Sequence, residues 1–203
     1  MSFGVPFNTS PLNAKRTLSY SARGREIPGY YYNLGRFVDM FARVETAVTL
    51  TMWDYTTLDP GIAKILVGRT GIEAASGNIR QLAAVRGLPK YLQDDLTLVL
   101  QQLGVIIGVR NALLHYGVTS VVQGKAIVSN ALKAKGEPKL FPISPELLDQ
   151  MYWDLRKILV HLYFRHLKYA PSDKGLVSRI MGAEWQYKHS LMPKSRSKER
   201  ADS

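Results

Sequence analysis

The chain has 203 residues, of which 46% are hydrophobic and 21% charged, a composition that excludes a disordered chain and suits one domain with appended segments. It contains no cysteine, which excludes disulfides, thiolate metal sites and cysteine nucleophiles. Its net charge of +11 favours a polyanionic partner, chiefly nucleic acid or an anionic membrane surface, although charge of this size also serves solubility alone.

Targeting and membrane-spanning features are not evident in the sequence. The N-terminus lacks a basic region followed by an apolar core. No run reaches the ~20 consecutive apolar residues that a bilayer span requires. We therefore expect a soluble, cytoplasmic protein that does not enter a membrane.

The first half of the chain is expected to be an extended arm followed by helices. Residues 1–27 are rich in Ser, Asn, Pro and Gly and show no periodicity, which is typical of an arm. Apolar residues at helical spacing then predict helices at 30–56, 62–67 and 72–85.

A longer helix is predicted from about residue 92 to 116. Its apolar stripe consists of Leu96, Leu100, Leu103, Ile107 and Leu114. Arg110 falls within this stripe, where a charge is costly unless it is paired. Glu45, beside the apolar face of the first helix, is the leading carboxylate that could meet it, although a solvated Glu is the more common case.

Asn111 and His115 lie on the neighbouring row of the same helix, in line with Gly104 and Gly108. Two glycines one turn apart leave a shallow groove in which another helix can approach closely. Gly117 follows as a left-handed helix cap.

The remaining segments complete the organisation. Residues 119–132 predict a β-hairpin and 134–142 a polar loop. Ser144 is expected to cap a helix that runs to about residue 167, and a short helix is expected at 176–181. The division is an arm at 1–27, a helical domain at 28–168, an extension at 169–187 and a disordered basic tail at 188–203.

Common cofactor and nucleophile motifs are absent from the sequence. There is no glycine-rich phosphate loop and no nucleophile elbow. His161 and His166 are five residues apart, which directs them to different faces of a helix, so we interpret them as structural or surface histidines rather than metal ligands. We expect neither a metal nor a cofactor.

Arg110, Asn111 and His115 remain as candidate catalytic residues. Histidine exchanges protons near neutral pH, and arginine can hold a phosphate and offset its developing charge. Asn111 could orient either group. A base and a cation without metal suffice to cleave RNA through its own 2′-hydroxyl.

However, Arg110 and His115 are separated by roughly 140° on a regular helix. A shared site therefore needs a helix that ends near His115, an arginine side chain that wraps around the helix, or two residues from different chains around a two-fold axis.

The segment Arg110-Asn111-Ala112-Leu113-Leu114-His115 resembles the R-x(4–6)-H signature of the HEPN domain family (higher eukaryotes and prokaryotes nucleotide-binding). The order of helices over residues 28–168 resembles that family too. The resemblance implies an all-α bundle that dimerises through helix 92–116 and brings two Arg/His sets into one cleft. Active members are metal-independent endoribonucleases of toxin–antitoxin, phage-defence and RNA-processing systems, which implies RNA or nucleotide as partner and an antitoxin as a further possibility.

Two features depart from the family pattern. The hairpin interrupts the last two helices, and Tyr116 follows His115 directly where many of the toxins place an aromatic or polar residue two positions on. Other family members only bind or act as scaffolds. In that alternative, Arg110 and Asn111 bridge Glu45 or helix-end carbonyls, and His115 caps the helix.

Overall fold

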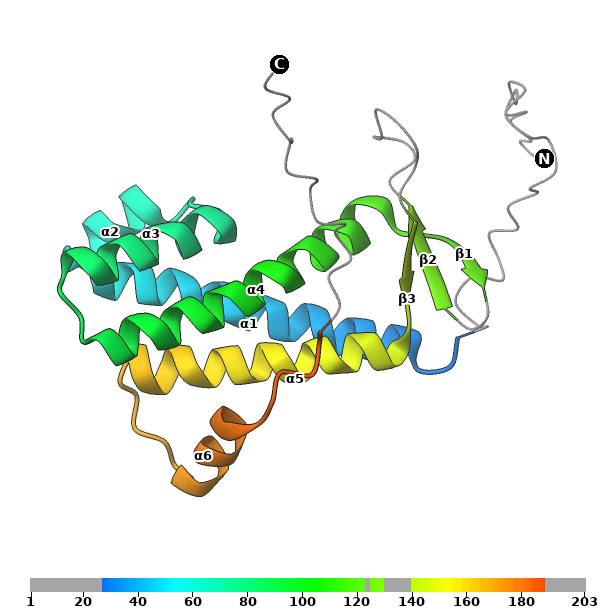
Figure 1. Cartoon of the computed structure of the whole chain (residues 1–203). Coiled ribbons are helices and arrows are strands. Elements are labelled where there is room, and N and C mark those ends of the chain that lie inside the picture. The colour runs from blue at the N-terminus through cyan, green and yellow to red at the C-terminus, as the bar shows by residue number, and fades with distance from the viewer. Residues whose placement is uncertain (1–26, 123–124, 130–139, 189–203) are drawn as a thin grey trace, which may run out of the picture.

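The computed structural model describes residues 27–122, 125–129 and 140–188 (Figure 1). Its elements are α1 (Tyr30–Thr56), α2 (Pro60–Val67), α3 (Ile72–Val85), α4 (Lys90–Tyr116), β1 (Val118–Val122), β2 (Lys125–Ser129), β3 (Leu140–Ile143), α5 (Pro145–His161), the π-helix η1 (Leu162–His166) and α6 (Lys174–Gly182). The predicted N-terminal arm, except Ile27, and the basic tail after Lys188 lie outside the described residues.

The long helices α1, α4 and α5 form the body of the molecule. α1 and α5 lie side by side and run in the same direction, and α4 runs the opposite way across them (Figure 1). Arg36 and Asp149, near the starts of α1 and α5, form an ion pair of 2.7 Å. Asp95, near the start of α4, contacts His161 at the end of α5. These pairs fix the directions of the three helices.

The helix predictions at 30–56 and 72–85 are confirmed. α2 begins two residues earlier than predicted, at Pro60, because the Asp59 carboxylate accepts hydrogen bonds from the first free amides, those of Gly61 and Ile62. α6 is also longer than predicted, and the Asp173 carboxylate caps it in the same way.

The α5 segment has a regular start and an irregular end. Ser144 caps it as predicted, because its hydroxyl accepts a hydrogen bond from the Leu147 amide at 3.2 Å. After His161 the helix widens into one π-turn, where the amide of Leu167 donates to the carbonyl of Leu162, five residues earlier. No feature of the sequence predicted this turn.

A small antiparallel sheet of order β1-β2-β3 flanks the C-terminal end of α4 (Figure 1). The predicted hairpin corresponds to β1 and β2. The predicted polar loop at 134–142 is wrong at its end, because Phe141 and Ile143 alternate with Pro142 and are buried as part of β3. Pro142, which has no backbone N–H, is tolerated because β3 is an edge strand, whose outer side pairs with no other strand. The fold is therefore mostly helical with a small sheet.

One hydrophobic core joins α1, α3, α4, α5, the sheet and the chain that follows α6. The predicted stripe of α4 is buried at Leu96, Leu100, Leu103 and Ile107, but Leu114 is 49% exposed and Leu113 takes its place in the core. Tyr187, in the predicted C-terminal extension, is also fully buried. The extension therefore contributes to the core of the helical domain.

By length and composition, α4 could cross a membrane, contrary to the expectation that no segment qualifies. Half of its most apolar window is buried inside the protein, and the core helix of a soluble protein passes the same test. This property of α4 is therefore weak evidence for a membrane span.

Candidate functional site

The last turns of α4 hold Arg110 and Asn111 against α1. The Arg110 guanidinium donates through Nη1 to Oδ1 of Asn111 at 3.1 Å. Its carbon Cζ lies 5.2 Å from the centroid of the Phe41 ring, within range of a cation–π contact. Both polar side chains are half-buried. The neighbouring amide and the ring thus fix the guanidinium in position.

The predicted ion pair between Glu45 and Arg110 is absent. Glu45 is exposed on α1, one turn after the buried Phe41, and stays hydrated. Arg110 forms no ion pair with any residue of the described segments. Its charge is compensated by an aromatic face and a neutral amide, which leaves the cation available to an anion.

His115 lies in the last turn of α4 and is exposed. Tyr116, which ends the helix, is half-buried and packs against the core. Gly117 has a positive φ of 60° as expected, but its ψ of −179° is extended rather than left-handed. This combination is almost restricted to glycine, so Gly117 sets the direction in which the chain leaves His115.

Arg110 and His115 do not share a site within one chain. α4 is regular through Tyr116, so the two residues keep the separation of roughly 140° that five helical positions impose. Arg110 faces Phe41 of α1, whereas His115 faces solvent. Of the predicted arrangements, α4 does end near His115, at Tyr116, but both residues lie within its regular part, and Arg110 lies over Phe41 rather than wrapping toward His115. A composite of two chains stays a prediction.

Three apolar side chains on the outer face of α4 are not covered by the described chain, and exposed Asp94 and Gln101 lie between them. Tyr91, Leu98 and Val105 are 66%, 50% and 38% exposed and recur every seven residues. Gly104 is exposed beside them, and a Cβ at that position would meet no atom within 4 Å. An open stripe with heptad spacing and a glycine gap is a surface on which a second helix can pack.

A second polar cluster, which the sequence did not predict, lies at the opposite end of α4. Asp95 is buried and accepts three hydrogen bonds, from His161 Nδ1 at 2.9 Å, Arg165 Nη1 at 2.5 Å and His166 Nε2 at 3.0 Å. The Tyr55 hydroxyl lies 2.8 Å from the other ring nitrogen of His166. We call these five residues the Asp95 cluster.

The protonation states in the Asp95 cluster follow from its contacts. Burial disfavours the Asp95 anion, but hydrogen bonds from His161 and His166 and the charge of Arg165 outweigh burial and hold its pKa well below the usual range. Burial raises the pKa of Tyr55 to about 12, so its hydroxyl stays protonated and can donate to His166 Nδ1. These bonds assign the Nε2–H tautomer to a neutral His166.

The π-turn explains why the prediction for these histidines missed their shared partner. On a regular helix, His161 and His166 point to different faces. The wider turn from Leu162 to His166 reduces the angle per residue and lets both rings reach Asp95. The interpretation of both as structural histidines agrees with their burial and hydrogen bonding.

The described residues include no group of three His, Asp or Glu side chains able to hold a metal ion.

Comparison with protein-family models, with curated proteins and with solved structures finds no match to this chain. The site must therefore be interpreted from its own geometry.

Proposed function

We propose that this protein is a metal-independent endoribonuclease with a HEPN-type helical fold, and that it acts as a two-fold dimer. The observation that carries the proposal is the state of Arg110: a half-buried guanidinium, fixed by Asn111 and Phe41, with no carboxylate partner in the described chain. A purely structural arginine at such a position would be expected to meet an anion of the protein. A phosphate of RNA is a fitting partner.

The reaction requires two proton transfers and one charge stabiliser. A histidine takes the proton of the ribose 2′-hydroxyl, whose oxygen attacks the adjacent phosphorus. The bond from phosphorus to the 5′-oxygen breaks, and that oxygen receives a proton from a second acid. The products are a 2′,3′-cyclic phosphate and a 5′-hydroxyl. His115 of each copy supplies one proton carrier, and Arg110 stabilises the negative charge on the phosphoryl oxygens.

The open stripe of α4 supports the dimer. Two copies packed through Tyr91, Leu98 and Val105 would bury apolar surface that one copy exposes. Close approach of the two copies at Gly104 would place the C-terminal half of α4 beside the same part of α4 in the second copy. This composite arrangement resolves the angular separation of Arg110 and His115, since each residue then has a counterpart on the other copy.

A second candidate is a non-catalytic module of the same fold that binds RNA, nucleotide or a protein. The contacts of Arg110 favour it, because a guanidinium held by Asn111 and Phe41 also stabilises the packing of α4 on α1. His115 would then be an ordinary helix-end residue.

From the resemblance alone, we also propose a cytoplasmic location and a role as a toxin or defence component, with an antitoxin as a possible partner.

Incubation of the purified protein with mixed RNA in EDTA separates the two candidates. The nuclease proposal expects cleavage that EDTA does not affect, products that end in cyclic phosphate, and loss of cleavage in His115→Ala. A folded, dimeric protein that leaves RNA intact, with and without Mg²⁺, favours the binding module instead.

A further inference from the structure

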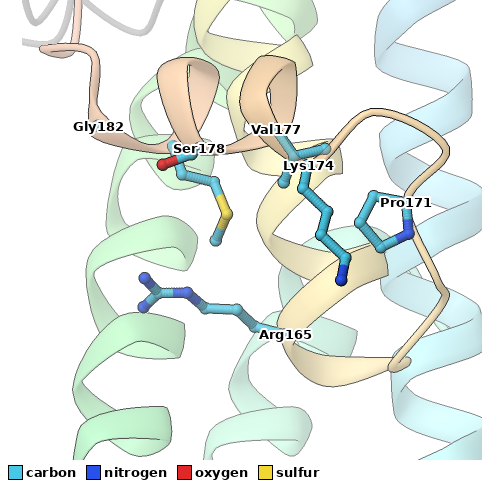
Figure 2. A pocket seen from close by; sticks show the side chains of 7 residues that line it. Arg165, Pro171, Lys174, Val177, Ser178 and Gly182 are labelled. Atoms are coloured by element: carbon cyan, nitrogen blue, oxygen red, sulfur yellow. The ribbon is translucent and has the colours of Figure 1, made fainter.

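A cavity of about 450 Å³ lies between the π-turn and α6 (Figure 2). Its lining residue Arg165 contacts Asp95 near the start of α4, whereas Arg110 lies near the end of that helix. Its polar lining consists of Arg165, Lys174 and Ser178, and its apolar lining of Pro171, Val177 and Met181. In Figure 2, Lys174 extends from α6 into the hollow, and Arg165 runs along the opposite wall with its guanidinium turned away from the Lys174 ammonium. The volume lies within the ~300–1,000 Å³ typical of small-molecule sites.

The charges that line this cavity are positive. Lys174 is exposed and has no hydrogen bond or ion pair within the described segments. Arg165 uses one nitrogen for Asp95, and its side chain is still 43% exposed. Ser178 is exposed as well, and its hydroxyl has no partner among the residues that the structure describes. No carboxylate lines the cavity. Three donors around a hollow without an acid favour an anionic ligand.

We propose that this cavity binds a small organic phosphomonoester. A terminal phosphate offers three acceptor oxygens and up to two negative charges, whereas a carboxylate offers two oxygens and one charge, so a phosphate better suits a lining with two cations and a hydroxyl. The organic part of the ligand would lie against Pro171, Val177 and Met181. This site is independent of the proposed nuclease function, because it shares no residue with Arg110 and His115.

Arg165 can turn toward such a ligand at limited cost. Asp95 keeps its hydrogen bonds to His161 and His166 when Arg165 is drawn away, so the buried carboxylate is not left without donors. The guanidinium also has five N–H groups, which allows it to contact Asp95 and a phosphate together.

Calorimetric titration of the full chain with phenyl phosphate, benzoate and phenol tests the proposal. These probes carry the same ring with a phosphate, a carboxylate or no charge at neutral pH. We expect phenyl phosphate to bind at least ~10-fold more tightly than either analogue, because it alone supplies three acceptor oxygens. Equal or tighter binding of benzoate, or no saturable binding of phenyl phosphate in the millimolar range, would overturn the proposal.

Two variants locate the binding. Lys174→Ala should weaken phenyl phosphate by about tenfold or more through loss of a charge-assisted hydrogen bond. Lys64→Ala, an exposed lysine on α2, is the control for general charge and should change affinity less than about twofold. Equal losses of affinity in Lys174→Ala and Lys64→Ala, or no loss in Lys174→Ala, would place binding elsewhere and contradict the proposal.

Discussion

Nε2 of His166 lies 3.0 Å from Oδ2 of Asp95, although 71 positions separate the two residues in the chain. The contact joins the last turn of the α5 segment to the second turn of α4, and neither side chain is more than 8% exposed. Since Asp95 also holds His161 and Arg165, one buried carboxylate fixes the relative position of two long helices at this end of the molecule.

Asp95→Asn should lower the free energy of unfolding by roughly 2–4 kcal/mol, because it removes the anion that three donors share and leaves them poorly paired. Urea unfolding followed by circular dichroism measures the effect. Asp94→Asn is the matched control: its carboxylate is exposed and, among the described residues, pairs with Lys90 alone at i,i+4, so its loss should cost less than ~1 kcal/mol. Equal effects of the two substitutions would show that the Asp95 cluster adds no stability.

The Asp95 cluster should also make stability depend on acid pH. The pKa of Asp95 is lower in the folded than in the unfolded state, so the unfolded chain binds its proton first as the pH falls. Its stabilisation is complete above the ordinary aspartate pKa of about 4 and is lost as the pH falls toward the folded pKa. Between roughly pH 4 and pH 2, wild type should therefore lose more stability than Asp95→Asn. If the free energy of unfolding depended on pH in the same way in wild type and Asp95→Asn, this prediction would be contradicted. The control Asp94→Asn should show the same pH dependence as wild type.

Much of the helical framework could be predicted from the sequence because its signals are local. The ends of α1 and α3 follow from apolar periodicity and the turns around them, and Ser144 caps α5 through a bond to its own next turn. The third strand was missed because it is short and its pairing with β2 depends on residues far along the chain. Strand partners are set by tertiary packing, which a local pattern does not contain.

The candidate site was predictable in its residue types but not in its contacts. Arg110 interrupts an apolar stripe, a local signal, whereas its contact with Phe41 depends on how α4 crosses α1. Glu45 was a reasonable partner by position along α1, yet its side chain is exposed. The convergence of His161 and His166 on Asp95 required a π-turn, which has no sequence pattern of its own in this chain.

Gly104→Ala tests the proposed dimer. In a single copy of the protein, this change should stabilise α4 by about 0.5–1 kcal/mol, because alanine favours a helix more than glycine does and nothing lies within 4 Å of the new Cβ. If a second copy packs closely there, the methyl group should instead weaken association. Gly35→Ala, on the exposed face of α1 with equal space around it, is the control. Light scattering across a concentration series should show a higher dimer dissociation constant for Gly104→Ala alone. A wild-type monomer at micromolar concentration would contradict the dimer.

Substitution of His115 and Arg110 tests the proposed chemistry. His115→Ala removes the proton carrier and should lower the RNA cleavage rate by ~10²–10⁴-fold, while stability changes by less than ~0.5 kcal/mol because the side chain is exposed. Arg110→Ala should reduce the rate at least as much, since charge stabilisation at phosphorus is often the larger effect. Arg110→Lys should restore only part of it, because an ammonium lacks the planar, two-pronged donor geometry. Cleavage rates come from single-turnover assays on labelled RNA.

Arg156→Ala is the control that separates chemistry from packing around Arg110. Arg156 lies on α5 with its Cζ 5.1 Å from the Trp153 ring centroid, close to the 5.2 Å between Arg110 and the Phe41 ring. Both alanine variants should lose a similar cation–π contribution of about 0.5–1 kcal/mol in unfolding free energy. Arg110→Ala alone should lose cleavage. If instead Arg110→Ala unfolds or no longer dimerises, and Arg110→Lys restores the fold while the wild type never cleaves RNA, then Arg110 acts as a packing residue and the binding module is the correct function.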